Sequence, residues 1–109
     1  MKRLLAAMTF AILASTAAPA EATYWFKVND ASQIQYQIGP PDRIFLRNLS
    51  QFDGTVLGCC YNYWIDLSTA AGKAQWATLL AKMQAKESIW IFVMSQTQVG
   101  TIDSIGEID

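Results

Sequence analysis

One segment of this chain has helical periodicity, while the rest mostly alternates between apolar and polar residues. That single helical segment restricts the possible folds of the sequence more than any other feature. Residues 68–86 are rich in alanine, and their large apolar residues recur on one helical stripe. We expect that stripe to face the core, and Ser68, or alternatively Asp66, to be the N-cap. The stripe consists of Trp76, Leu79, Leu80 and Met83.

The segments on either side of this helix have the composition and alternation of β-strands. The predicted strands cover residues 23–28, 32–38, 43–49, 55–67, 88–95 and 99–108. Gly58 marks a bend in the fourth of them, and the last is expected to be bulged. The unbroken apolar run at residues 89–94 is typical of a strand buried on both faces, or of one covered at an interface.

The order of these elements predicts a mostly-β α+β domain. Three or four strands precede the helix and two follow it. A helix between the third and fourth of five strands is the arrangement of an OB-fold, so we expect an OB-fold-like five-stranded barrel. A ferredoxin-like fold would need a second helix, and no other segment has the helical period.

The first residues have the features of a bacterial secretion signal. A basic start precedes an apolar stretch at residues 4–14, which is too short to span a bilayer. Small residues then allow cleavage after Ala20 or Ala22. We therefore expect residues 1–20 to be a signal peptide and residues 21–109 to be a single OB-like domain, without a membrane span. The predicted location is periplasmic or secreted.

Charge and composition exclude several functions. Without Lys2 and Arg3 of the leader, six basic residues stand against nine acidic ones, a net charge of −3. Nucleic-acid binding is therefore not expected. The chain has no histidine, and it shows no acid–base pair, nucleophile triad or phosphate-binding glycine loop. We expect a protein that is not an enzyme, with no cofactor and no metal site.

Cys59 and Cys60 are adjacent and are the only two cysteines of the chain. Three arrangements remain open: thiols that are free or buried, a disulfide between subunits, and a vicinal disulfide between the two neighbours. Too few other ligands are present for a metal site, and the Cys-x-x-Cys spacing of redox catalysts is missing.

The alternation through residues 59–67 supplies candidate ligand-binding residues. It directs Tyr61, Tyr63 and their alternate neighbours toward the core, and it places an amide, an indole ring and a carboxylate on the opposite face. This mixture binds sugars by stacking and hydrogen bonding, although a tryptophan there also suits a barrel edge or a subunit contact. A second aromatic cluster lies near the start of the mature domain. The candidates are Asn62, Trp64, Asp66, Tyr24 and Trp25.

The helix and the strand after it carry a resemblance to a known family. Residues 66–74 read DLSTAAGKA, Leu79 and Leu80 follow, and the apolar strand comes at residues 89–93. Over residues 66–94 the chain resembles small exported bacterial OB-fold proteins related to the B subunits of AB5 toxins. In that family "LS" followed by "GKA" opens the helix between the third and fourth strands.

The resemblance implies a homo-oligomeric ring, in that family a pentamer, that binds cell-surface glycans. Family members often pair a cysteine of the third strand with one near the fourth or fifth, and no cysteine follows Cys60 here. No sugar-binding residue of the family is matched position by position, so none is carried over.

Two functions follow as expectations for this exported, non-catalytic protein. The first is a glycan-binding, B-subunit-like module that forms a homo-oligomeric ring. The alternative is a periplasmic structural or protein-interaction module with no sugar ligand, in which the apolar strand at residues 89–94 contacts a different protein of the envelope.

Overall fold

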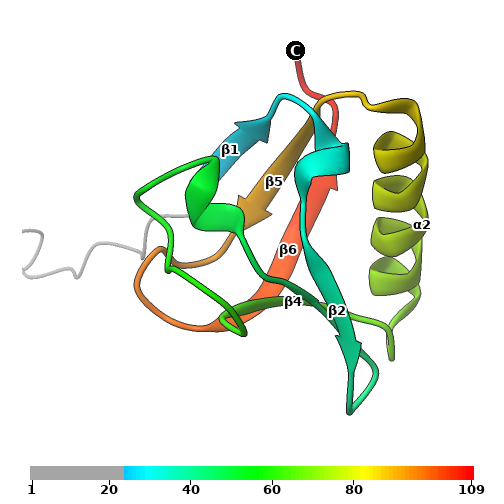
Figure 1. Ribbon diagram of the computed structural model, residues 1–109. Coiled ribbons are helices and arrows are strands. Elements are labelled where there is room, and N and C mark those ends of the chain that lie inside the picture. Colours follow the sequence, from blue (N-terminus) through cyan, green and yellow to red (C-terminus); the bar gives the residue numbers. More distant parts are fainter. Residues whose placement is uncertain (1–23) are drawn as a thin grey trace, which may run out of the picture.

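The computed structural model describes residues 24–109, so the expected signal peptide at residues 1–20 and its cleavage points at Ala20 and Ala22 lie outside the described residues. The strands are β1 (Tyr24–Val28), β2 (Tyr36–Gly39), β3 (Arg43–Leu46), β4 (Tyr63–Asp66), β5 (Ile89–Val93) and β6 (Gly100–Gly106) (Figure 1). The helices are the α-helix α2 (Ala70–Ala85) and the short 3-10 helices η1 (Ala31–Gln33) and η2 (Leu49–Gln51).

All six strands form one open sheet in the order β1-β5-β6-β4-β3-β2. Neighbouring strands are antiparallel except β4 and β6, which run parallel. The expected mostly-β α+β domain with one α-helix is confirmed for residues 24–109. Six strands are present where five were expected, the sheet is not closed into a barrel, and α2 follows the fourth strand rather than the third.

The connection between β1 and β2 explains why the second strand starts later than predicted. Asp30 accepts hydrogen bonds from the backbone N–H and the hydroxyl of Ser32, at 2.9 and 2.6 Å, and so caps η1. The buried Asn48 side chain accepts the Gln35 N–H at 2.8 Å and donates to the Gln33 carbonyl oxygen at 2.9 Å. These bonds keep the connection out of the sheet, so the predicted strand at residues 32–38 is reduced to β2.

The start of α2 differs from the prediction by one residue. Thr69 is the N-cap, because its side-chain oxygen accepts the Gly72 N–H at 2.9 Å. The Asp66 carboxylate instead accepts hydrogen bonds from the backbone and the hydroxyl of Ser68. A Cβ atom at Gly72 would lie only 1.7 Å from the Asp66 carbonyl oxygen, so the helix and β4 approach here as closely as glycine permits.

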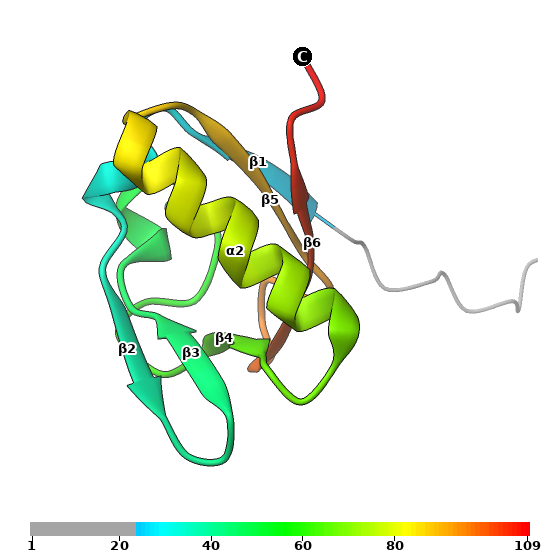
Figure 2. The same ribbon diagram turned by 90° about the vertical axis from the view of Figure 1, so that its right-hand side faces the viewer.

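The predicted apolar stripe of α2 is only partly buried. The helix runs along one side of the sheet and contacts η1, β4 and β6 (Figure 2). Leu79 is fully buried, and Trp76 and Met83 pack against the core at its margin. Leu80, by contrast, is 36% exposed, so the stripe is wider than the surface that the sheet covers.

The strand β5 lies at the centre of the core, but it is buried on one face only, so the expectation of a strand buried on both faces is wrong. Ile89, Ile91 and Val93 are fully buried, while Trp90 and Phe92 on its other face are partly exposed. Its pairing with β6 shifts register between Phe92 and Val93, which agrees with the bulge expected in the last strand. No α-helix within residues 24–109 combines the length and the apolar character that crossing a membrane requires.

The predicted strand at residues 55–67 is mostly a loop, and only β4 is extended within it. Tyr63 is buried as expected; its hydroxyl donates to the Ser95 carbonyl oxygen at 2.9 Å and accepts the Leu57 N–H at 3.2 Å. The expectation for Tyr61 is wrong, because this side chain is 50% exposed. The alternation that would point it inward begins only at Tyr63, where β4 starts.

Candidate functional site

The outer side of β3, facing away from the core, carries two arginines and a phenylalanine. Ile44 and Leu46 are buried, and the residues that alternate with them, Arg43, Phe45 and Arg47, are partly exposed. This is the two-residue period of a strand with one buried face. The three side chains therefore share one surface of the sheet.

Phe45 joins this surface to two aromatic side chains from the segment around β4. Phe45 is paired with Trp64 in the β3–β4 ladder, and the two ring centres are 6.0 Å apart in an edge arrangement. The Tyr61 ring meets Phe45 edge-on from the other side, with ring centres 5.1 Å apart. We call Arg43, Phe45, Arg47, Tyr61 and Trp64 the aromatic–arginine face.

Each end of the aromatic row is capped by a guanidinium group. The Arg43 Cζ atom lies 4.1 Å from the centre of the Trp64 ring, and the Arg47 Cζ atom lies 5.4 Å from that of Tyr61. Both distances are within the range of cation–π attraction. Within residues 24–109 the ion pairs involve Lys27 and Lys82 but neither arginine. The Arg47 Nε atom is buried without a hydrogen-bond partner, so the donors open to an external acceptor are those of Arg43 and the terminal nitrogens of Arg47.

Two residues of β2, Gly39 and Gln37, fix the positions of the Phe45 and Tyr61 rings. Gly39 leaves space for Phe45, because a Cβ atom there would lie 3.1 Å from the Cε2 atom of that ring. The Tyr61 hydroxyl donates to the Gln37 Oε1 atom at 3.1 Å. β2 therefore holds the aromatic row from one edge of the sheet.

Asp66 supplies a negative charge beside Arg43. The hydrogen bonds from the Ser68 hydroxyl and backbone N–H, together with the Arg43 charge, hold the pKa of the Asp66 carboxyl below its ordinary value. Arg43 and Asp66 are partners in the β3–β4 register, yet the structure shows no ion pair between them. Asp66 is therefore an ionised acceptor at neutral pH, already partly occupied by Ser68.

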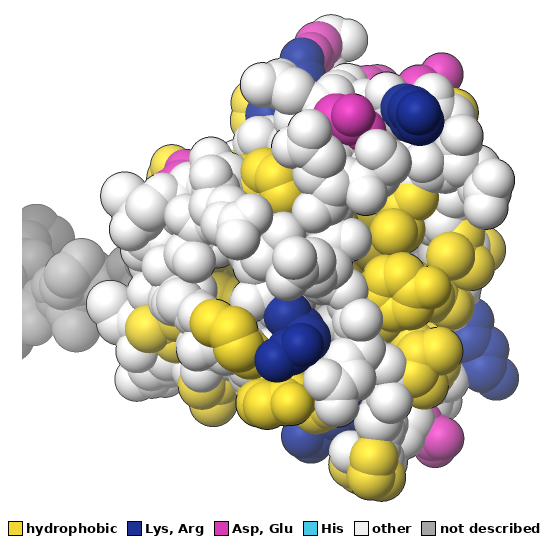
Figure 3. Space-filling view, in the orientation of Figure 1, with side chains coloured by type: hydrophobic (Ala, Val, Ile, Leu, Met, Phe, Trp, Pro, Cys, Tyr) yellow, Lys and Arg dark blue, Asp and Glu magenta, His cyan; other side chains and the backbone are white. Residues whose placement is uncertain are grey.

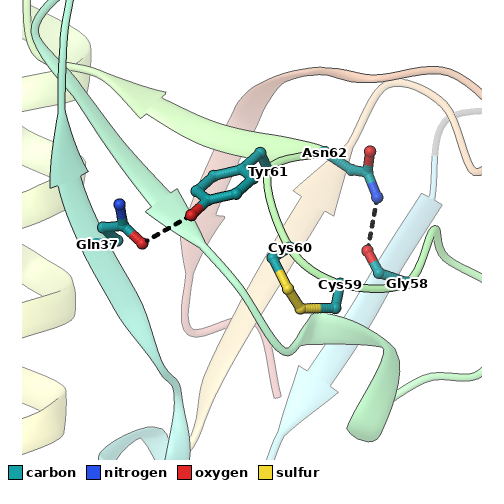
Figure 4. The surroundings of a disulfide bond; sticks show 6 residues. All are labelled: Gln37, Gly58, Cys59, Cys60, Tyr61 and Asn62. Carbon is teal, nitrogen blue, oxygen red and sulfur yellow. Dashed lines mark hydrogen bonds between the residues drawn. A yellow bond between two sulfur atoms is a disulfide. The ribbon is translucent and has the colours of Figure 1, made fainter.

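The loop before β4 contains the cysteine pair and presents Tyr61 to the face (Figure 4). Of the three arrangements left open by the sequence, the structure has the vicinal disulfide between Cys59 and Cys60. The Asn62 Nδ2 atom donates to the Gly58 carbonyl oxygen at 2.6 Å, which closes the turn around the pair. No strand pairing holds these residues, since β4 begins at Tyr63.

The structure gathers only some of the predicted site residues. Trp64 lies in the aromatic–arginine face, and Asn62 and Asp66 lie beside it on the same segment. Tyr24 and Trp25 lie on β1, which β5 and β6 separate from β4. The Tyr24 hydroxyl donates to Asp53 at 2.6 Å, and the Trp25 ring packs 4.6 Å from the centre of the Phe92 ring. The structure therefore does not bring Tyr24 and Trp25 to the same site as Trp64.

Four residues of the face were missed by the sequence analysis: Arg43, Phe45, Arg47 and Tyr61. A signal for three of them was present, because Arg, Phe and Arg at alternate positions of a predicted strand must share its outer side. For Tyr61 no local signal was available, since strand alternation predicted the opposite orientation.

A separate hydrophobic surface lies over β2 and α2, where apolar side chains gather in the space-filling view (Figure 3). Ile38 is 64% exposed and Tyr36 is 44% exposed, both on a strand whose outer edge is unpaired. Leu80 of α2 extends this surface, which we call the β2–α2 patch. A groove of about 340 Å³ runs beside it, lined by Ser32, Tyr36, Leu80, Met83, Gln84 and Lys86.

No group of three or more His, Cys, Asp or Glu side chains is placed to hold a metal ion within residues 24–109. Comparison of the chain with protein-family models, with curated proteins and with solved structures found no match.

Proposed function

We propose that this chain is an exported, non-catalytic binding protein that takes a saccharide on its aromatic–arginine face. The single observation that carries the proposal is the row of three adjoining aromatic rings, ended by two guanidinium groups, on one outer surface of the sheet. Aromatic rings stack on the apolar faces of sugars, and polar side chains around them bind the hydroxyl groups.

The contacts within the face suit an open sugar-binding surface. Phe45 and Trp64 are partly exposed and Tyr61 is half exposed, so ring surface remains for a ligand. Arg43 and Arg47 supply N–H donors, and Asp66 and the exposed Gln37 amide supply acceptors. A ligand that lies along the row would therefore meet apolar surface in the middle and hydrogen-bonding groups at both ends.

The strand order supports an OB-fold when β1 and β2 are counted as two parts of one first strand. β1 then pairs with the fourth strand, β5, and β2 pairs with the second, β3. The helix α2 falls between the third and fourth strands, as in the proteins that the sequence resembles. OB-folds bind oligosaccharides and oligonucleotides on the surface of their second and third strands, which correspond here to β3 and β4.

We further propose that copies of this chain assemble into a ring, as the resemblance to toxin B subunits implies. The β2–α2 patch supports assembly, because Ile38 and Tyr36 expose apolar surface beside an unpaired strand edge. Such an edge accepts a strand or side chains from another chain. The occupant we propose for this patch is a second copy of the same chain.

A protein-interaction module without a sugar ligand is the second candidate. It is favoured by a different surface, where Trp25 on β1 packs against Phe92 on β5 and both remain partly exposed. An envelope protein bound there would leave the aromatic–arginine face free.

A glycan array with two matched tryptophan variants separates these functions. Trp64→Ala removes a ring of the aromatic–arginine face, and Trp25→Ala removes a comparable ring outside it. We expect the parent protein and Trp25→Ala to retain the same glycans, and Trp64→Ala to lose about threefold to tenfold in affinity, because an aromatic contact contributes about 0.5–1.5 kcal/mol. Absence of any retained glycan, or equal binding by both variants, would refute the proposed function.

A further inference from the structure

The cysteine pair lies directly beside the proposed site, and the proposed binding function gives it no role. Cys60 is the neighbour of Tyr61 in the chain, and Tyr61 is the ring that closes one end of the aromatic–arginine face against Phe45 and Arg47. Figure 4 shows the disulfide in the same turn as Tyr61, whose side chain reaches across to Gln37 on β2 (Figure 4).

We propose that the Cys59–Cys60 disulfide holds Tyr61 on the aromatic–arginine face, and that reduction of the pair by an external dithiol releases Tyr61 and weakens ligand binding. The positioning of Tyr61 stands on the structure alone. The loss of ligand binding rests on the proposed function.

The segment that presents Tyr61 has few other restraints. Its backbone is held by the Asn62 side chain bonded to the Gly58 carbonyl oxygen and by the Gly100 N–H, which donates to the Asn62 carbonyl oxygen at 2.9 Å. The Tyr61 side chain is held by its own hydroxyl bond to Gln37. None of these bonds involves Cys59 or Cys60. The disulfide is the covalent restraint on the backbone next to Tyr61, and opening it frees the side-chain torsions of the two cysteines and the backbone torsions on either side of the peptide between them.

The disulfide can be reached from solution, and the chain has no third cysteine with which it could exchange. Cys59 is exposed and Cys60 partly exposed, so a dithiol from solution can reach the bond. The chain contains two cysteines, so exchange with a third protein thiol of the same chain is excluded.

The reaction is an ordinary thiol–disulfide exchange. A thiolate of the reductant attacks one sulfur and forms a mixed disulfide, while the other cysteine leaves as a thiolate and takes up a proton. The second thiol of the reductant then displaces the first cysteine. The protein gains two electrons and two protons, and the reductant leaves as its cyclic disulfide.

The structural half of the proposal is tested by nitrogen-15 relaxation of the full chain before and after dithiothreitol, with thiol titration to verify that both cysteines are reduced. We expect the backbone order parameter of Tyr61 to fall from about 0.85, the value of rigid backbone, to below about 0.6. The order parameters of Ile44 and Val93 in the core should stay unchanged. A double variant, Cys59→Ser with Cys60→Ser, should behave as the reduced protein in either condition.

Two results would overturn this half. One is an unchanged Tyr61 order parameter after complete reduction. The other is a simultaneous loss of order at Ile44 and Val93, since the pair would then stabilise the whole domain rather than position one ring.

The binding half uses the glycans that the array retains. Reduction should weaken their binding about threefold to tenfold, the value expected for loss of one aromatic contact, and Tyr61→Ala should bind weakly and be insensitive to reduction. Equal affinity of the oxidised and reduced proteins for a retained glycan would overturn control of binding. If no glycan is retained, the proposed function fails, and the relaxation data alone decide the role of the disulfide.

Discussion

Replacement of Asn48 by alanine tests the account of the β1–β2 connection. Asn48 is 5% exposed, and its side chain accepts the Gln35 N–H and donates to the Gln33 carbonyl oxygen. A third hydrogen bond, to the Gln51 side chain at 3.2 Å, can be replaced by water at the exposed Gln51. Alanine therefore leaves two backbone groups near a buried position without their partner.

The expected loss follows from these two bonds. Each hydrogen bond contributes about 0.5–1.5 kcal/mol, and an unsatisfied buried group costs about 1–3 kcal/mol. Gln33 and Gln35 are exposed, so water can partly reach their backbone groups. The lower part of the range for an unsatisfied group therefore applies to the Gln33 carbonyl and to the Gln35 N–H. We expect Asn48→Ala to lower the free energy of unfolding by about 2 kcal/mol and the melting temperature by about 8–16 °C.

Urea denaturation followed by tryptophan fluorescence provides the measurement. The matched control is Asn29→Ala, an exposed asparagine just after β1 whose side chain makes no hydrogen bond to another of residues 24–109. Asn48→Ala should lower the urea midpoint at an unchanged slope, while Asn29→Ala should leave both unchanged. A midpoint for Asn48→Ala equal to that of the control would show that Asn48 does not hold the connection.

Three further predictions concern the helix start, the exposed patch and acid stability. Gly72→Ala should destabilise the domain more than Asn48→Ala in the same urea assay, because its Cβ would lie 1.7 Å from the Asp66 carbonyl oxygen; a smaller effect would contradict the close approach of α2 and β4. Ile38→Lys should reduce the mass measured by light scattering to that of one chain, whereas Lys73→Ala on the exposed side of α2 should not; an oligomer that survives Ile38→Lys excludes the β2–α2 patch as the interface. The pKa of Asp66 is lower in the folded chain than its ordinary value of 3.8, so Asp66 binds protons more weakly when folded. Its contribution to stability is therefore present above pH 3.8 and is lost as the pH falls through the folded pKa. Asp66→Asn should therefore flatten the fall of the urea midpoint below about pH 4, and an unchanged pH profile would contradict the role of Ser68.

The elements that local periodicity determines were predictable from the sequence. The alanine-rich helix, the apolar β5 and the buried position of Tyr63 follow from the spacing of apolar residues, which tertiary contacts only reinforce. The separation of β1 from β2 was predicted too, as two strands at residues 23–28 and 32–38. The late start of β2 at Tyr36 did not follow, because it depends on the Asn48 side chain reaching back across the chain to Gln33 and Gln35.

The candidate site was only partly predictable, because it is made by strand pairing. Trp64 was identified from the pattern of its own strand. Phe45 lies opposite Trp64 only through the β3–β4 register, and Tyr61 reaches the row from a loop that the sequence assigned to a strand. Tyr24 and Trp25 were grouped with Trp64 on aromatic content, which carries no information about the place of β1 in the sheet.

The pairing of β1 with β5 has a consequence for how the chain is made. The first strand finds its hydrogen-bonding partner near the other end of the chain, with Tyr24 opposite Val93 and Val28 opposite Ile89. During synthesis β1 emerges long before β5, so it stays unpaired until almost the whole chain is available. Contacts this distant along the chain also slow folding. For the exported protein that we propose, the sheet is complete only once β5 and β6 have both crossed the membrane, since β6 joins β5 to β4.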